Sequence, residues 1–192
     1  DNDLFMWDFC VDSEENTYIV GRFGEDTNFG YPNDSAIYSV ESGYEDSFVV
    51  KYDNEGEFLW VKILSGEFVA GFGDEGITSC AVDKDDNLYI GGYFNGTVDL
   101  DLGGGEDIFV SNGRGDGFVS VYSPEGTYVE SYIFGSPHTH YYDSVEDIFI
   151  TSEYIYIAGE YRTSNFDIDA TEGVDLRSAS GDADVYLSKY NL

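Results

Sequence analysis

Two pairs of acidic residues are the clearest candidates for chemistry in this 192-residue chain. One residue separates Asp99 from Asp101, and one residue separates Asp167 from Asp169. In an extended segment this spacing places both carboxylates of a pair on the same side of the backbone. Ca²⁺ is a hard ion that prefers such oxygen ligands. Each pair is therefore a candidate Ca²⁺ site, and the alternative is a solvated acidic face whose intervening aliphatic residue packs inward.

Histidine and cysteine offer fewer options. His138 and His140 could share a metal in an extended loop, but no third ligand is identifiable, which favours a solvent-exposed pair. Cys10 and Cys80 are offset by one position on equivalent predicted strands, so they either face each other across two neighbouring sheets or point away. Disulfide geometry is strict, which favours buried free thiols.

No arrangement of residues marks a catalytic centre. The two histidines are the only ones, no serine lies in a Gly-x-Ser-x-Gly elbow, and no carboxylate pair stands out as catalytic among 39 acidic residues. A glycosidase or lyase that uses two carboxylates stays open as an alternative. The sequence predicts a protein that is not an enzyme, has no catalytic residues and requires no cofactor, with Ca²⁺ as the candidate ion.

An internal repeat of about 70 residues must position these groups. One landmark, a polar turn followed by a Tyr-containing strand, begins at Val11, Val82 and Ile150. The spacings are 82 − 11 = 71 and 150 − 82 = 68. A second landmark begins at Asp46, Asp116 and Asp184, with spacings of 116 − 46 = 70 and 184 − 116 = 68. Two landmarks that keep one period indicate three copies of one structural unit.

Each unit is predicted to contain four antiparallel strands, because short runs of β-branched and aromatic residues alternate with Asp, Asn and Gly turns. The first strands are predicted at 5–11, 77–82 and 145–150. The second strands are predicted at 17–23, 88–94 and 155–161. The third strands begin at the Asp of the second landmark, which is expected to accept backbone N–H bonds in a turn. The fourth strands are predicted at 58–64 and 128–134, and the third unit lacks one.

The motifs of the first two units resemble a known repeat. Residues 82–94 and 96–101 of the second unit, and residues 46–53 of the first with Gly56 and Trp60, resemble the SBBP-type β-propeller repeats of bacterial and archaeal secreted and cell-surface proteins. Those repeats read VDxxGNxYxxGxF, GTVDFDPG and DxFVxKYDxxGxxxW. The chain departs from them at Tyr31-Pro32, where the Asp-x-Asp element is lost, and at Glu130, where Trp is expected. The resemblance implies a fold rather than an activity.

The predicted fold class is all-β: a single β-propeller segment over residues 1–192. Its three four-stranded blade repeats are expected at about 4–66, 75–136 and 143–192, the last lacking its outer strand. Three blades are fewer than the four to eight that usually close a ring. We therefore expect the segment to belong to a larger or oligomeric ring, and its partners to be further propeller blades from the same longer chain or from another subunit.

The charge narrows the range of partners. With 8 basic and 39 acidic residues, the net charge is −31, which excludes phosphate binding through Lys and Arg clusters and argues against nucleic acid or an anionic membrane. No apolar run is long enough to insert into a bilayer. Two Asn-x-Ser/Thr sequons, at Asn33 and Asn95, give weak support for an extracellular or cell-surface location.

These observations favour a non-enzymatic extracellular scaffold that serves structure or recognition in a larger surface protein or assembly. The alternative is a carbohydrate-binding or carbohydrate-active propeller with its site in the channel-facing loops. Trp7 and Trp60 lack counterparts in the other units, which makes them candidates for stacking on a sugar. The protein or glycan ligand is not specified by the sequence.

Overall fold

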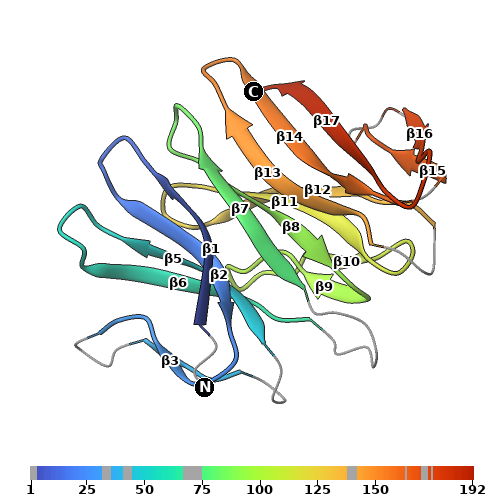
Figure 1. Cartoon of the computed structure of the whole chain (residues 1–192). Helices are drawn as coiled ribbons and strands as arrows, with labels where there is room; N and C mark the ends of the chain where they lie inside the picture. Colours follow the sequence, from blue (N-terminus) through green and yellow to red (C-terminus); the bar gives the residue numbers. More distant parts are fainter. Residues whose placement is uncertain are drawn as a thin grey trace.

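The computed structural model describes residues 4–31, 36–40, 45–66, 75–137, 142–162, 164–169, 173 and 175–192, and within them the chain forms strands and no helix (Figure 1). Sheet I contains β1 (Leu4–Val11), β2 (Thr17–Phe23), β5 (Asp46–Tyr52) and β6 (Phe58–Leu64). Sheet II contains β7 (Gly76–Val82), β8 (Leu88–Phe94), β11 (Asp116–Tyr122) and β12 (Tyr128–Phe134). Sheet III contains β13 (Ser144–Ile150), β14 (Tyr154–Tyr161) and β17 (Asp184–Asn191).

The strand prediction is confirmed in these sheets. All neighbouring strands pair antiparallel, in the order in which the chain makes them. Sheets I and II have four strands, whereas the described residues of sheet III supply three. Three small hairpins between the second and third strands of the units were not predicted. They are β3 (Thr27–Asn28) with β4 (Ile37–Tyr38), β9 (Thr97–Asp99) with β10 (Ile108–Val110), and β15 (Ser164–Asp167) with β16 (Leu176–Ser178).

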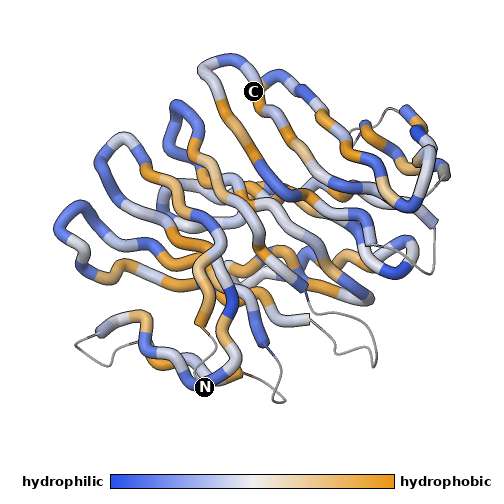
Figure 2. The backbone as a smooth tube through the Cα atoms, viewed as in Figure 1, coloured by the Kyte–Doolittle hydropathy of each residue, from blue (hydrophilic) through white to orange (hydrophobic). Residues whose placement is uncertain are grey.

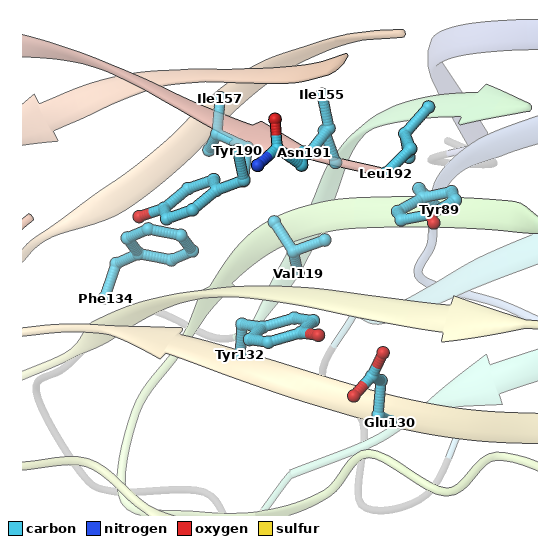
Figure 3. A pocket seen from close by; sticks show the side chains of 10 residues that line it. All are labelled: Tyr89, Val119, Glu130, Tyr132, Phe134, Ile155, Ile157, Tyr190, Asn191 and Leu192. Atoms are coloured by element: carbon cyan, nitrogen blue, oxygen red, sulfur yellow. The ribbon is translucent and has the colours of Figure 1, made fainter. Parts of the chain in front are cut away.

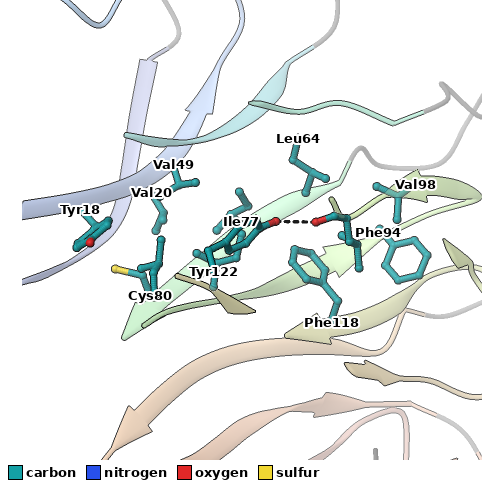
Figure 4. Packing of buried hydrophobic residues seen from close by; sticks show 13 residues of the cluster. Tyr18, Val20, Val49, Leu64, Ile77, Cys80, Phe94, Val98, Phe118 and Tyr122 are labelled. Atoms are coloured by element: carbon teal, nitrogen blue, oxygen red, sulfur yellow. Dashed lines mark hydrogen bonds between the residues drawn. The ribbon is translucent and has the colours of Figure 1, made fainter. Parts of the chain in front are cut away.

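The three sheets follow one another and pack face to face. Strand β7 of sheet II packs against β1, β2 and β5, and β13 of sheet III packs against β7, β8 and β11. We call the face of a sheet that meets the following sheet its front, and the opposite face its rear. The first interface, between sheets I and II, and the second interface, between sheets II and III, each enclose an apolar cluster. Figure 4 shows the first cluster, and Figure 2 shows hydrophilic turns beyond the apolar strands.

A repeated bulge shapes the first strand of every sheet. The pairing register shifts between Met6 and Asp8, and it shifts at the equivalent positions of β7 and β13. Opposite each bulge lies a glycine of the second strand. A Cβ atom on Gly21 would lie 1.9 Å from the Phe5 carbonyl oxygen, and Gly92 and Gly159 face similar carbonyl contacts. Only glycine lets the backbones approach this closely.

The bulge also links successive sheets through hydrogen bonds. The backbone N–H of Cys80 donates to Oδ2 of Asp8 in the preceding sheet, at 3.0 Å. The N–H of Ile148 donates to Oγ of Ser79 in the same way, at 3.2 Å. Asp8 and Ser79 occupy equivalent positions beside the bulge. The same polar contact therefore occurs at both interfaces, and it sets the position along the strands at which each sheet packs on the next.

The two cysteines overturn one prediction. Cys10 on the front of sheet I and Cys80 on the rear of sheet II form a disulfide with a Cα–Cα distance of 5.9 Å. The preference for buried free thiols was therefore wrong. The one-residue offset does place the two side chains on opposite faces of their sheets. Because sheets I and II stack front to rear, those faces meet, and the thiols come together.

No helix in the described part of the chain has the length and apolarity needed to cross a membrane. The apolar residues instead alternate along strands and fill the interfaces, where Tyr18, Phe94, Phe118 and Phe134 are completely buried. This placement follows from the two-residue period of a strand, which directs alternate side chains to the front and the rear.

Candidate functional site

The first aspartate of each predicted Ca²⁺ pair acts as a turn cap. Oδ1 of Asp99 accepts the backbone N–H groups of Asp101 and Asp107, both at 3.0 Å. Oδ1 of Asp167 accepts those of Asp169, at 3.1 Å, and Asp175, at 2.9 Å. The two hairpin loops are thus built alike, and each uses one carboxylate oxygen to satisfy backbone donors.

The second aspartate of each pair lies over a glycine-containing loop. Asp101 accepts the N–H of Gly103 at 2.8 Å, and the carboxylate of Asp169 lies close to Gly173. The intervening Leu100 packs inward, as the solvated-face alternative expects. In the described part of the chain, no three His, Cys, Asp or Glu side chains gather to hold a metal. Ca²⁺ binding at Asp99, Asp101, Asp167 and Asp169 stays a prediction, and His138 and His140 lie outside the described residues.

Two of the aspartates that begin the third strands, Asp116 and Asp184, cap turns as predicted. Asp116 accepts the backbone N–H of Asn112, and Asp184 accepts that of Ser180, both at 2.7 Å. Asp116 is almost fully buried, and its Oδ1 has no hydrogen-bond partner. Burial, helped by the nearby charge of Asp143, raises the pKa of Asp116 to about 7, although the Asn112 bond opposes the shift.

A lysine occupies the first interface. The Nζ atom of Lys51 lies 3.1 Å from Oδ2 of Asp12 and 4.7 Å from the centre of the Tyr18 ring. Trp60 meets the same Tyr18 ring edge-on at 5.8 Å. Burial opposes the charge on Lys51, but hydrogen bonds and charge from Tyr18 and Asp12 outweigh it and raise the pKa of the lysine. Burial likewise opposes ionisation of Asp12, but hydrogen bonds from Asn16 and the charge of Lys51 hold its pKa below the usual value.

A cleft lies at the equivalent place in the second interface. It has a volume of about 230 Å³ and is open to solvent on one side. Figure 3 shows Glu130 and Tyr132 of β12 on one side of it, with Ile155, Ile157 and Tyr190 of sheet III opposite. The other lining residues are Tyr89, Val119, Phe134, Asn191 and Leu192.

Three substitutions between repeats distinguish this cleft from the first interface. Val121 stands at the position of Lys51, Glu130 at that of Trp60, and Tyr132 at that of Lys62. A short aliphatic side chain and an exposed carboxylate leave unfilled the space that the lysine and the indole fill at the first interface. The sequence marked only one of the three, because Glu130 departs from the expected Trp. The cleft itself went unpredicted, since its formation depends on how two sheets pack.

The second interface keeps the counterparts of Asp12 and Tyr18 of the first interface. Tyr89 stands at the position of Tyr18 and donates from its hydroxyl to Oδ2 of Asp83, at 3.5 Å. Asp83 stands at the position of Asp12. Burial and the charge of Asp83 raise the pKa of Tyr89 to about 12. Burial and a hydrogen bond with Glu130 raise the pKa of Tyr132 to about 12 as well. Both phenols are neutral at pH 7 and face an acidic surface.

The two outermost sheet faces carry exposed apolar residues. Leu187 on the front of sheet III is 66% exposed, whereas its counterparts Val49 and Val119 are at most 1% exposed. On the rear of sheet I, Phe9 is 58% exposed, whereas its counterpart Ile148 is 4% exposed. The first group also includes Phe149 and Val185, and the second includes Met6 and Val11. These positions are thus buried when a sheet follows or precedes and exposed at the ends of the described stack. The rest of the rear of sheet I is covered, because Phe23, Phe48 and Val50 pack with Phe29 and Ala36 in a third apolar cluster.

The two tryptophans and one sequon have ordinary structural places. Trp60 packs into the first interface against Tyr18. Trp7 lies at the bulge of β1 with the Arg22 guanidinium 5.7 Å from its ring centre. Asn95 is buried, so its side chain is not presented on the folded surface. Asn33 lies outside the described residues.

Comparison with known proteins supports a repeat architecture. No protein-family model matches the chain. The chain is 25% identical, over 212 aligned positions and 94% of its length, to an uncharacterized WD repeat-containing protein of Acanthamoeba polyphaga mimivirus. It spans 14% of the length of that protein. WD repeats form four-stranded propeller blades, so this similarity suggests a β-propeller-like repeat protein. The more specific resemblance to SBBP-type repeats stays a prediction.

Proposed function

We propose that this chain is part of a non-enzymatic β-propeller that serves as a structural and protein-binding scaffold outside the cell. One observation carries the proposal: the sheets stack by a repeated front-to-rear contact, and apolar residues of that contact are exposed at both ends of the described stack, on the front of sheet III and on β1 at the rear of sheet I. Exposed apolar patches of this kind mark interaction surfaces on soluble proteins. The similarity to a WD repeat-containing protein supports the same scaffold role.

The partner expected at the front of sheet III is the rear of a further repeat unit. Leu187, Phe149 and Val185 would meet apolar residues of a first strand, as Val119 meets sheet III now. Asp147 follows Asp8 and Ser79 in the series of bulge positions. Its Oδ1 accepts the hydroxyl of Ser79 at 3.4 Å, and its second carboxylate oxygen would accept a backbone N–H of the next unit, as its two counterparts do. Front and rear faces differ, so copies of the chain would associate head to tail and either close a ring or extend.

Sedimentation of the purified chain over a range of concentrations tests this proposal. Head-to-tail association would give species heavier than the 21.4-kDa monomer. Leu187→Glu should abolish them by burying a charge in the contact. Val110→Glu is the matched control, because Val110 is similarly exposed, at 68%, on the β10 hairpin. A wild type that stays monomeric at all concentrations, or equal effects of the two variants, would contradict the proposal.

Carbohydrate recognition is the second candidate. Tyrosines that line an open cleft favour it, because aromatic rings with a polar hydroxyl suit contact with sugars. A glycan array together with an assay for released reducing sugars separates the two functions. Saccharide turnover would overturn the non-enzymatic proposal, and binding without turnover would favour a lectin-like scaffold.

A further inference from the structure

The first interface contains a complete binding site for an ammonium group, and the chain fills it with its own lysine. Lys51 contributes the cation, Asp12 the carboxylate at 3.1 Å, and Tyr18 the ring face at 4.7 Å. The Nζ of Lys51 also donates to the carbonyl oxygen of Pro124, at 3.1 Å. A buried ammonium is stable there because an opposite charge, an aromatic face and a carbonyl oxygen replace its water.

The second interface keeps the receiving groups and lacks the cation. Tyr89 replaces Tyr18 and Asp83 replaces Asp12, with the same hydroxyl-to-carboxylate geometry. Val121 replaces the lysine, so no side chain of the chain reaches into the space from that position. None of the ten residues that line the cleft is basic, and Glu130 adds a second carboxylate at its rim.

The geometry points to a binding site for an alkylammonium group in the cleft between Tyr89, Tyr132 and Glu130. The ring of Tyr89 would contact the cation as Tyr18 contacts Lys51, and the carboxylate of Glu130 would balance its charge. The aliphatic stem of the ligand would lie against Val119, Ile155 and Ile157, which are buried apolar residues of the cleft wall. A volume of about 230 Å³ suits one extended side chain or a small amine rather than a drug-sized molecule.

The electrostatic surroundings favour a cation. Glu130 lines the cleft from β12, and Asp83 accepts a hydrogen bond from the hydroxyl of Tyr89, which lines the cleft as well. Two lysines next to these residues in sequence have partners of their own: Lys84 pairs with Asp85, and Nζ of Lys189, on the front of sheet III, lies 3.4 Å from the ring centre of Tyr154. Because the phenols of Tyr89 and Tyr132 stay neutral, they can donate hydrogen bonds to the acids while their ring faces remain available. Two sources could supply the ammonium, a lysine side chain of a partner protein or a free small amine.

Calorimetric or NMR titration with Nα-acetyl-lysine amide tests the site, with Nα-acetyl-norleucine amide as an almost isosteric uncharged control. The lysine derivative should bind and shift the resonances of Tyr89 and Tyr132, and the norleucine derivative should not. Equal binding of both, or binding of neither, would overturn the proposal. A second comparison uses butylamine and a lysine-containing pentapeptide. Tighter binding of the peptide indicates a protein lysine as the natural ligand, and tighter binding of butylamine indicates a free amine.

Variants locate the binding in the cleft. Glu130→Gln should weaken lysine binding several-fold, while Glu55→Gln, an exposed change in the turn before β6, should leave it unchanged. Val121→Lys recreates the Lys51 arrangement, so it should raise the melting temperature and abolish binding of the added amine. If Val121→Lys does not fold, Glu130→Trp serves instead, because it restores the indole and should also block binding. Unaltered binding in Glu130→Gln and in the folded cleft-filling variant would place the amine elsewhere and refute the site.

Amine binding at the cleft is independent of association through sheet III. Leu187→Glu changes the front of sheet III, whereas the cleft lies at the rear of that sheet. This variant should therefore lose self-association and keep lysine binding. Either result can fail alone, and the two proposals are thereby distinguished.

Discussion

The two interfaces between sheets use equivalent strands but are held together differently. The first carries a disulfide, a buried Lys51–Asp12 pair, and a contact in which the Ser13 hydroxyl and N–H donate to Asp86. The second keeps the apolar cluster and the backbone-to-Ser79 hydrogen bond but has a cleft where the lysine and indole would be. Equivalent strands thus form either a filled or an open interface, and three side chains differ between the two.

This difference distinguishes the features that all three sheets share from the contacts that are particular to the first interface. The apolar strand faces, the bulge and the glycine opposite it occur in all three sheets, so they form the common framework. The disulfide joins sheets I and II, and the Lys51–Asp12 pair, formed within sheet I, lies at the same interface. The first interface is therefore expected to be the more stable and the second the more adaptable, and the following changes test that contrast from the largest effect to the smallest.

Loss of the disulfide should have the largest effect. The bond joins residues 70 apart in sequence, and closing a loop of that length stabilises a fold by about 4 kcal/mol in the chain-entropy model. Cys10→Ser with Cys80→Ser should lower the free energy of unfolding by that amount in urea denaturation. Reduction of the wild type should give the same loss, and reduction of the double variant should give none. A wild type insensitive to reduction would show that the first interface does not depend on the bond.

The pH dependence of stability should report on Asp116 in sheet II. Its pKa is raised to about 7 when folded, so it stays protonated in the fold while the unfolded chain ionises near pH 4. Its contribution is thus complete below about pH 4 and is lost as pH rises through 7, by up to about 4 kcal/mol. Asp116→Asn keeps the acceptor for Asn112 and cannot ionise, so its stability should fall less than that of the wild type between pH 4 and 7. Parallel pH profiles would contradict this.

Removal of the buried lysine should weaken the first interface. Lys51→Met leaves the Asp12 carboxylate buried without its cation, which costs about 3 kcal/mol when one partner of a buried pair is deleted. Adding Asp12→Asn should recover part of the loss, because the unpaired charge is gone. The equivalent Asp83 lacks a lysine and is only partly buried, so Asp83→Asn should change the unfolding free energy much less. Equal losses of unfolding free energy in Lys51→Met and in Asp83→Asn would remove the predicted contrast.

Two turn residues should respond to glycine to different extents. Glu15 and Asp86, in the turns between first and second strands, have the left-handed backbone conformation, with φ of 65° and 63°. In the turns between third and fourth strands, glycines take this conformation, at Gly56 and Gly126. Glu15→Gly should stabilise the protein by about 1 kcal/mol because it relieves this strain. Asp86→Gly should gain less or nothing, because it also deletes the hydrogen bonds to Ser13. Thermal unfolding of both variants measures the difference, and a larger gain for Asp86→Gly would refute the proposed link between the turns.

Calcium should give the smallest effect. If the Asp99–Asp101 and Asp167–Asp169 pairs bind Ca²⁺, excess Ca²⁺ should raise the melting temperature relative to chelator, and by less in Asp101→Asn. Sodium at equal ionic strength controls for screening of the net charge of −31. No difference between Ca²⁺ and the control salt would remove the Ca²⁺ hypothesis for both hairpins.

The sequence predicted the strands well because their signals are local. The positions of β2, β6, β8 and β12 match the predicted ranges residue for residue, since each is an apolar run between turn residues. The small hairpins were missed because strands of two to four residues carry too little periodicity. The disulfide and the cleft depend on which sheet faces meet. The roles of Cys10, Cys80 and Glu130 could therefore be assigned only once the stacking of the sheets was known.

The disulfide has a further consequence for the chain under mechanical load. Cys10 and Cys80 are 70 positions apart, so tension applied at the two ends bypasses the segment between them while the bond is intact. About 122 of the 192 residues (192 − 70) could then be drawn out, and the oxidised chain would be shorter at full stretch by about 240 Å than the reduced one. Most of sheet I and the beginning of sheet II therefore act as an inextensible link that yields only when the sulfur–sulfur bond is cut.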